Sequence, residues 1–331
     1  GGRVSAVRAG RHRSRSAGPE DATIAALGSN CLCGDLEAVL HANALCNELG
    51  LDTISVGGTI AFAMECHERG LLSDGDLDLD LDWGKGDTIV ALVERIARRE
   101  GVGELLGRGV RHAAREIGPE ATRYALHVKG LEVPGQEPRI AKSFGLGHAT
   151  SNRGADHLYA LPTIDVAGLD GAARRLLPGV YPRVLDMADE ATKASLVQFG
   201  EDYCAVSDAL GVCKFTTTEM YALDPEHLAQ ALDALGLPMD AKRLLEVGER
   251  IVNLERLMNR RLGVDGRADA LPARFLEEPL EVAHGDALDE HRIESLPSML
   301  SDYYRLRGWG EDGLPTAAVL ERLGLADWSA T

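Results

Sequence analysis

The feature that most constrains the fold of this chain is the recurrence of apolar residues at steps of three and four between helix-capping residues. Residues 36–49 follow Asp35, which suits an N-cap, and stop at Gly50, which suits the residue after a helix. The same spacing relates Leu244, Val247, Ile251, Leu254 and Met258. Further helices are expected over residues 59–69, 88–99, 104–116, 187–210, 297–306 and 317–323. Aromatic residues make up only 5% of the chain and strand signals are scarce, so the fold class is predicted to be mostly α.

Length and helix-breaking residues suggest two domains. The chain has 331 residues, which corresponds to about two domains at roughly 150 residues each. Pro134, Gly135 and Pro138 interrupt the helical pattern. One helical domain is therefore expected over residues 18–136 and a second over residues 137–331.

Residues 1–17 are expected to form a flexible basic arm. Residues 3–15 carry arginines and no acidic residue, and they show neither the apolar core of a secretory signal nor a clear amphipathic helix. The chain begins with Gly1 and not with Met, so we expect a processed chain or a fragment.

The charge balance and the cysteine content exclude several classes of function. Lys and Arg number 35 against 52 Asp and Glu, a formal charge of −17, which argues against nucleic acid as the main partner. No apolar run approaches the roughly 18 to 20 residues of a membrane span, so we expect no membrane association. Six cysteines in a chain of this length do not make a disulfide scaffold, and they favour a reducing, cytoplasmic compartment.

An acidic segment stands apart at residues 73–84, where aspartates alternate with apolar residues. This period of two predicts a short edge strand or an extended loop with one acidic face. A calcium site is the lesser alternative, because the spacing of an EF-hand is absent.

Two hexapeptides in different halves of the chain share one pattern. Residues 47–52 read Asn-Glu-Leu-Gly-Leu-Asp and residues 208–213 read Asp-Ala-Leu-Gly-Val-Cys, each after a predicted helix. A glycine at the fourth place, Gly50 or Gly211, makes a turn that exposes backbone amides and directs the side chain at the sixth place. Two such turns facing a cleft between the domains would suit a two-armed anionic ligand. A glycine after a helix is also a common structural feature by itself.

The sequence around these turns closely resembles the family of tungsten-containing aldehyde:ferredoxin oxidoreductases. The resemblance runs nearly end to end, and it covers the two helical C-terminal domains of that family but not its N-terminal β domain. It is carried by residues 18–20, 27–31, 43–55, 61–65, 128–132, 149–154, 271–274 and 303–309.

The resemblance implies a bis-pterin cofactor that holds tungsten, or in some members molybdenum. In that family each of the two turns binds one pterin, and the Cys of the second turn is also a ligand of a 4Fe-4S cluster. Cys213 is therefore implied as the metal ligand. The implied pterin-binding residues of the turns are Asn47, Gly50, Leu51, Asp52, Asp208, Gly211 and Val212.

The resemblance also implies three residues near the reacting atoms. Arg153 and His157 match a segment that lines the pterin and the metal, where Arg153 could pair with a phosphate and His157 could move a proton. The alternative for His157 is an ordinary packed or solvated side chain. Glu20 matches a segment whose carboxylate approaches the active site of the family.

The chain departs from the family pattern at two places. The other three cluster cysteines of the family form a Cys-x-x-Cys-x-x-x-Cys run that precedes the point where this chain begins. Cys31 and Cys33 are expected to be packing residues and not substitutes for them. Ala22 replaces a second Glu that relatives carry two residues after Glu20. If that Glu is the acid/base group, the chemistry is impaired.

Two functions remain open at this point. In the first, the chain is the cofactor-binding part of an oxidoreductase that converts a small aldehyde to a carboxylate and passes electrons through the cluster to ferredoxin or a similar acceptor. In the second, it is a non-catalytic remnant or a partner subunit that keeps the helical fold but cannot turn over alone. A homodimer is compatible with either.

Overall fold

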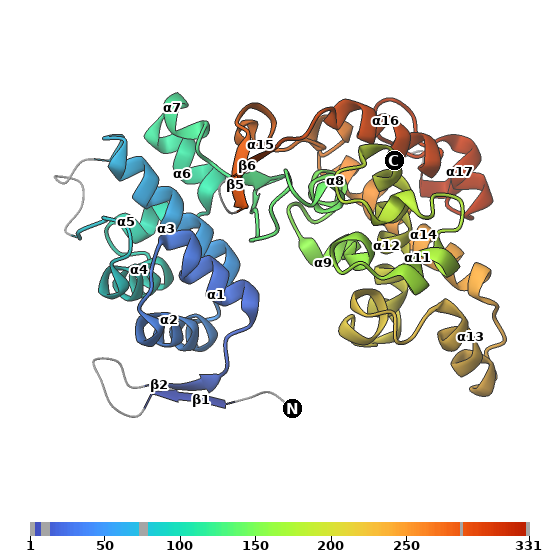
Figure 1. The fold of residues 1–331 in the computed structure, drawn as a ribbon, viewed down its shortest axis with the longest axis horizontal. Coiled ribbons are helices and arrows are strands. Elements are labelled where there is room, and N and C mark those ends of the chain that lie inside the picture. Colours follow the sequence, from blue (N-terminus) through green and yellow to red (C-terminus); the bar gives the residue numbers. More distant parts are fainter. Residues whose placement is uncertain (1–3, 8–13, 73–78, 285–286, 329–331) are drawn as a thin grey trace. The chain divides into compact units, whose positions relative to one another are not determined.

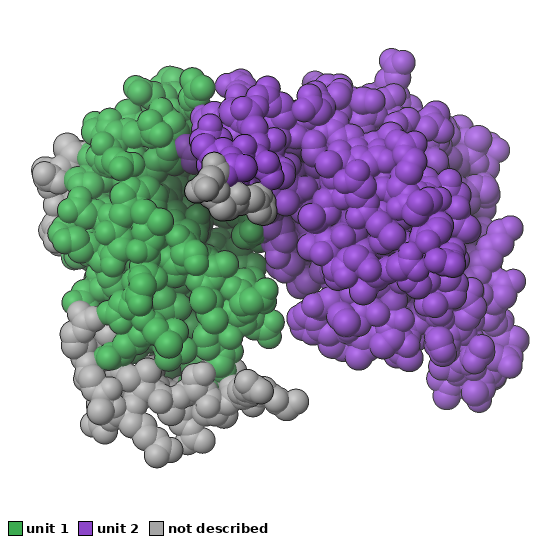
Figure 2. Space-filling view, viewed as in Figure 1, with its two compact units in different colours: residues 1–135 green, residues 136–331 purple. Residues whose placement is uncertain are grey.

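The computed structural model describes residues 4–7, 14–72, 79–284 and 287–328. The chain divides into two compact units, Gly1–Gly135 and Gln136–Thr331, which are coloured green and purple in Figure 2. Helices dominate both units, and the strands pair into two-stranded antiparallel sheets (Figure 1). The prediction of a mostly α fold is confirmed. Within the described ranges, no helix has both the length and the hydropathy that crossing a membrane requires.

Unit 1 is a helical assembly with two small hairpins. Its elements are β1 (Val4–Val7), β2 (Ser14–Ala17), α1 (Asp21–Leu27), η1 (Ser29–Cys31), α2 (Leu36–Leu49), α3 (Thr53–Glu68), α4 (Gly86–Arg98), α5 (Val102–Leu106), α6 (Val110–Ile117), α7 (Pro119–Thr122), β3 (His127–Val128) and β4 (Leu131–Glu132).

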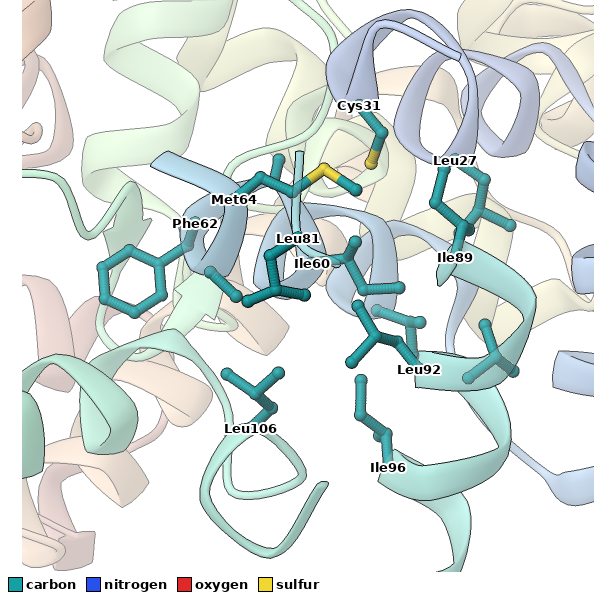
Figure 3. Packing of buried hydrophobic residues seen from close by; sticks show 14 of the residues in the cluster. Leu27, Cys31, Ile60, Phe62, Met64, Leu81, Ile89, Leu92, Ile96 and Leu106 are labelled. Atoms are coloured by element: carbon teal, nitrogen blue, oxygen red, sulfur yellow. The ribbon is translucent and has the colours of Figure 1, made fainter. Parts of the chain in front are cut away.

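The core of unit 1 forms around α3, which is buried on almost every side. In this core Ile60 of α3 points toward Leu92 of α4 and Met64 of α3 lies beside Cys31, and Leu27 of α1 and Ile89 of α4 belong to the same cluster (Figure 3). Helices α1 and α3 approach closely because α3 carries Gly57 where it crosses α1. A Cβ on that glycine would overlap the backbone of α1.

Within the segment expected to be a flexible arm, the structure describes residues 4–7 and 14–17, and both form strands. Strands β1 and β2 pair in antiparallel register, with Val4 opposite Ala17 and Val7 opposite Ser14. Strand β2 also contacts α2, where the Asn43 amide donates to the Ser16 hydroxyl at 3.0 Å. The pairing uses backbone groups and a partner helix more than 20 residues away, so the local composition gave no sign of it.

Two helix boundaries in unit 1 differ from the prediction. Helix α3 begins at Thr53 and not at residue 59, because Asp52 caps its first turn. The single helix expected over residues 104–116 is two helices, α5 and α6. They are separated at Gly109, whose φ of 84° lies in the left-handed region and is incompatible with a continuous helix.

The acidic segment is described only in its second part. Residues 73–78 lie outside the described residues, and residues 79–84 form a loop that contains no strand. There the Asp80 carboxylate pairs with Lys85 at 3.1 Å and accepts from the Asp82 amide at 3.1 Å. Among the described residues, no group of three or more His, Cys, Asp or Glu side chains could hold a metal ion.

Unit 2 is built from helices of very unequal length. Its elements are α8 (Lys142–Thr150), α9 (His157–Ala160), α10 (Thr163–Val166), α11 (Asp170–Leu176), η3 (Arg183–Leu185), α12 (Glu190–Leu210), η4 (Phe215–Glu219), α13 (Pro225–Ala234), α14 (Ala241–Arg261), η5 (Gly266–Ala268), α15 (Ala273–Glu277), β5 (Leu280–His284), β6 (Ala287–His291), α16 (Leu296–Arg307), α17 (Ala317–Arg322) and η6 (Ala326–Trp328).

Helix α12 is the centre of unit 2 and packs against α8, α9, α14 and α16. Two glycines allow α9 and α14 to approach α12 most closely. A Cβ at Gly200 would overlap the carbonyl oxygen of Ala160 in α9, and a Cβ at Gly248 of α14 would overlap that of Asp202 in α12. These contacts fix α9 and α14 along the length of α12, whose C-terminal end carries the second of the two turns.

The apolar stripe predicted for α14 is correct in spacing but rotated on the helix. Leu244 is buried, whereas Met258, at the other end of the stripe, is 51% exposed. The buried face instead includes Asn253 and Arg256, two polar residues. Arg256 reaches the Asp269 carboxylate and donates to the Gly313 carbonyl at 2.8 Å, and these partners make its burial tolerable.

Candidate functional site

The first turn follows α2, whose N-terminus is capped by Asp35 as predicted. Gly50 adopts φ 70° and ψ 36°, which ends the helix in the left-handed conformation. The Leu51 amide then donates to the Cys46 carbonyl at 2.8 Å, the long-range bond of a Schellman motif. The turn therefore leaves residues 47–50 at the surface of unit 1.

Two of the polar side chains of the first turn, Asp52 and Asn47, have structural partners. The Asp52 carboxylate accepts from the Ser55 amide at 2.9 Å, which makes Asp52 the N-cap of α3. The Asn47 amide donates to the Asn43 carbonyl at 2.9 Å and lies 3.4 Å from the Ser16 hydroxyl of β2. Both side chains are exposed and so remain accessible to a ligand.

Glu20 lies at the N-terminus of α1 with its side chain exposed. The hydroxyls of Thr23, in the first turn of α1, and Thr53, the first residue of α3, are 2.8 Å apart. The N-terminal ends of α1 and α3 therefore lie side by side. Glu20 and Asp52, which precede these two helices, are consequently at the same end of unit 1.

The second turn repeats the first at the end of α12. Gly211 adopts φ 68° and ψ 26°, and the Val212 amide donates to the Ser207 carbonyl at 2.9 Å. Cys213 follows with its side chain exposed, and its carbonyl accepts from the Thr216 hydroxyl at 2.7 Å. The two hexapeptides thus encode the same turn, each after its own helix.

Lys214, directly after the second turn, is a residue that the sequence analysis missed. Its ammonium lies 2.9 Å from the Asp208 carboxylate and donates to the Leu158 carbonyl at 2.8 Å. The first contact is within the turn, but the second reaches α9, far away in the sequence. In the sequence, the one sign of a role for Lys214 is its position next to Cys213, the predicted cluster ligand. That position does not show which residue the lysine contacts.

Arg153 and His157 lie on either side of the cap of α9. The Asp156 carboxylate accepts from the Leu158 amide at 2.8 Å and pairs with Arg153 at 3.0 Å. The Arg153 guanidinium also lies over the ring of Tyr159, 5.4 Å from its centroid. These contacts orient Arg153, which is itself exposed.

His157 is the first residue of α9 and is half-buried. Its charge affects the pKa of His148 in α8, whose ring is fully buried. Burial, and then the positive charge that His157 can carry, lower the pKa of His148 to about 3. His148 is therefore neutral at physiological pH.

A cavity of about 300 Å³ in unit 2 brings two predicted residues together, Arg153 and Asp208. Its other lining residues are Tyr159, Glu201, Ala205, Ala209, Ile251 and Glu255. Glu201 is 1% exposed, and its carboxylate accepts from Thr150 at 3.0 Å and from Tyr303 and Arg307 at 2.5 Å each. One wall of the cavity is therefore a buried polar network centred on the Glu201 carboxylate.

The cysteines separate into one exposed thiol and five buried ones, and all six are free. Burial raises the pKa of Cys31, Cys46, Cys66 and Cys204 to about 12 in each case. Cys31 lies in the core of unit 1 beside Met64 and donates to the Ala26 carbonyl at 3.4 Å (Figure 3). Because a metal binds the thiolate, these four are poor ligands, and Cys213 remains the accessible one.

Comparison with known proteins shows the family to which this chain belongs. The family model described as "Aldehyde ferredoxin oxidoreductase, domains 2 & 3" matches residues 2–325. The chain belongs to the aldehyde ferredoxin oxidoreductase family. This confirms the resemblance inferred from the sequence.

The chain spans about half the length of the curated aldehyde ferredoxin oxidoreductases that it matches. The tungsten-containing aldehyde ferredoxin oxidoreductase of Pyrococcus furiosus is 39% identical over 318 residues, and that of Thermococcus kodakarensis is 39% identical over 320 residues. Each alignment covers 94% of this chain and 49% of the relative.

Two further matches widen the comparison. The WOR-like subunit of an aliphatic sulfonate oxidoreductase from Pyrococcus furiosus is 28% identical over 340 residues, covering 98% of this chain and 49% of that protein. Among solved structures, the active-site complex BamBC of benzoyl coenzyme A reductase, bound to 1,5-dienoyl-CoA, matches with a TM-score of 0.74 and 22% identity. That alignment covers 93% of this chain and 49% of the other. The structural match shows a shared fold.

Proposed function

We propose that this chain is the cofactor-binding helical part of an oxidoreductase that oxidises a small aldehyde to a carboxylate. The reaction is RCHO + H₂O → RCOOH + 2 H⁺ + 2 e⁻. The observation that carries the proposal is the pair of matched Gly turns, in a chain 39% identical to tungsten-containing aldehyde ferredoxin oxidoreductases. The free thiols support the expected cytoplasmic location.

The turns fit the pterins of a tungsten or molybdenum bis-pterin cofactor. A Cβ at Gly50 or Gly211 would meet no atom within 4 Å, so the backbone of each turn is open to a ligand. Gly50 and Leu51, with the exposed side chains of Asn47 and Asp52, would hold one pterin. The other would be held by Gly211 and Val212 with Asp208 and Arg153. When bound, this cofactor supplies oxygen-atom transfer and accepts the two electrons.

The other proposed site residues would bind the anionic part of the cofactor or transfer protons. Arg153 presents an exposed guanidinium, oriented by Asp156, that would pair with an anionic phosphate arm of the pterin. The His157 imidazole would take or give a proton at a ring nitrogen during attack of water on the aldehyde. Glu20 provides an exposed carboxylate in unit 1 for the same purpose, without the second Glu that Ala22 replaces.

A 4Fe-4S cluster does not fit the described residues by themselves. Such a cluster needs four ligands, and Cys213 is the one exposed cysteine among the described residues. We propose Cys213 as one ligand and expect the other three from outside this sequence. Ferredoxin or a similar one-electron protein is the proposed acceptor. The second candidate is a partner subunit or remnant that does not turn over alone, and Ala22, in place of a second Glu after Glu20, supports it.

Metal and cofactor analysis distinguishes the two candidates. The chain, and the longest gene product that contains it, are produced in a host that is supplied with tungstate and makes the pterin. Tungsten, molybdenum and released pterin are measured together with aldehyde-dependent reduction of a viologen dye. The proposal expects stoichiometric metal and pterin and an aldehyde-dependent rate in the longer product. Absence of pterin from both products would reject the enzymatic function and leave the remnant.

A further inference from the structure

The Lys214 ammonium is held between two groups that belong to different parts of the proposed site. It lies 2.9 Å from the Asp208 carboxylate of the second turn and donates to the Leu158 carbonyl of α9 at 2.8 Å. The Lys214 side chain is only 14% exposed, whereas that of Asp208 is 56% exposed. The lysine is therefore the buried member of the pair, and Asp208 is the end that remains open to a ligand.

The backbone of Lys214 is also fixed. Its carbonyl accepts from the amides of Thr217 and Glu219 at 3.2 and 3.0 Å, which begins the turn of η4. A lysine side chain ordinarily loses much rotamer freedom when it is held in one geometry. Here two charge-assisted hydrogen bonds offset that loss in a partly dehydrated setting.

Helix α9 depends on such contacts because it is only four residues long. A helix of this length has no stability of its own in water. Its N-terminus is capped by Asp156, and its C-terminal residue Ala160 lies against Gly200 of α12. Lys214 supplies a third anchor in the middle, at the residue directly after His157.

We propose that Lys214 is a positioning residue, which ties the second turn to α9 so that Asp208 and His157 keep a fixed relation to each other. The inference rests on the proposed function for the roles of these two residues. The link itself is a property of the chain without its cofactor.

Amide hydrogen exchange on the full chain without cofactor tests the link. Lys214→Met removes the ammonium and keeps a long side chain. The amides of Tyr159 and Leu161, which donate to the Asp156 and His157 carbonyls at 3.2 and 3.1 Å, are expected to exchange roughly tenfold faster. Lys214→Arg, which can reach the same two oxygens, is expected to restore most of the protection. Lys242→Met, at an exposed position in the first turn of α14, is the matched control and should change neither amide.

Each outcome decides the inference. Faster exchange confined to α9 and the second turn, with rescue by arginine, supports a positioning role. Unchanged exchange in α9, or an equal increase throughout unit 2, would overturn it. If Lys214→Met does not fold, Asp208→Asn keeps the shape of the turn and removes one end of the link. The same two amides should then exchange faster, and unchanged exchange would again reject the link.

A second measurement separates this inference from the proposed function. The tungsten and pterin content of the longest gene product is compared between the original protein and Lys214→Met. Loss of pterin in the variant, together with the exchange effect, supports both proposals. If the original protein never holds pterin but the exchange effect is present, the link stands and the proposed function fails.

Discussion

Gly50 and Gly211 end two helices of different units in nearly the same left-handed conformation, with φ/ψ of 70°/36° and 68°/26°. In both turns the amide of the next residue donates to the carbonyl five positions earlier in the chain, at 2.8 and 2.9 Å. The repeated hexapeptide is therefore a repeated structure. The similarity rests on a backbone conformation that glycine adopts at little cost.

Replacing either glycine should destabilise the unit that contains it. For Gly50→Ala and Gly211→Ala we expect a loss of about 1 to 2 kcal/mol in the free energy of unfolding, because L-residues are strained at this φ. Urea unfolding followed by circular dichroism measures the change. Gly171→Ala, at an exposed helical position in α11 with open space around it, is the control and should be neutral or slightly stabilising. Equal losses in all three variants would argue against the special role of the turns.

His157→Asn should affect turnover more than folding in the intact enzyme. Asparagine keeps similar size and one hydrogen bond but cannot exchange a proton near neutral pH. We expect the rate of aldehyde oxidation to fall on the order of 10²- to 10⁴-fold, with the melting temperature almost unchanged. Steady-state kinetics and calorimetry of the same preparation check this. If the variant unfolds while the folded molecules turn over normally, His157 is structural and its assignment to the site is withdrawn.

This chain by itself should hold no stable 4Fe-4S cluster. Cys213 offers one exposed thiol, and burial raises the pKa of Cys31 to about 12, which disfavours the thiolate that iron needs. Anaerobic reconstitution followed by iron and sulfide analysis is expected to find far less than one cluster per chain. A full cluster that disappears in Cys31→Ser would contradict this and show that Cys31 and Cys33 serve as ligands.

Asp202 should make stability fall as the pH rises toward neutrality. Burial, only partly offset by the Arg307 guanidinium 2.5 Å away, raises the pKa of Asp202 to about 7. An aspartate in the unfolded chain titrates near pH 4, so between about pH 4 and 7 the folded protein holds a proton that unfolding releases. The free energy of unfolding should lose roughly 1.4 kcal/mol per pH unit in that window from this group.

The difference between the original protein and Asp202→Asn isolates this effect. Other groups also contribute to the pH dependence. The lowered pKa of His148, about 3, makes stability fall as the pH drops below the ordinary histidine range, which is the opposite slope. Urea unfolding of both proteins is measured between pH 4.5 and 7.5, and the free energy of unfolding of the original protein minus that of the variant should fall by roughly 1.4 kcal/mol per pH unit up to about pH 7. Parallel profiles would mean that Asp202 stays ionised against Arg307 throughout.

The parts of this protein that sequence predicted well are those set by neighbours in the chain. Asp35 and Gly50 frame α2 as expected, because a cap and a left-handed turn are satisfied within a few residues. The same locality made the two hexapeptides recognisable, and with them the family. The roles of Asn47, Asp52, Arg153 and His157 at a cofactor remain predictions.

The rest was decided by contacts between distant segments. Lys214 meets Leu158 across 56 residues, and Arg307 meets Glu201 across 106, so neither pairing is visible in any local pattern. On α14 the sequence carries a regular apolar stripe, yet Arg256 lies inside because Asp269 and the Gly313 carbonyl satisfy its guanidinium. A buried charge is stable only where its partners converge. The sequence therefore determined the helices, the two turns and the family, whereas tertiary packing alone decided which helix faces are buried and which polar side chains meet.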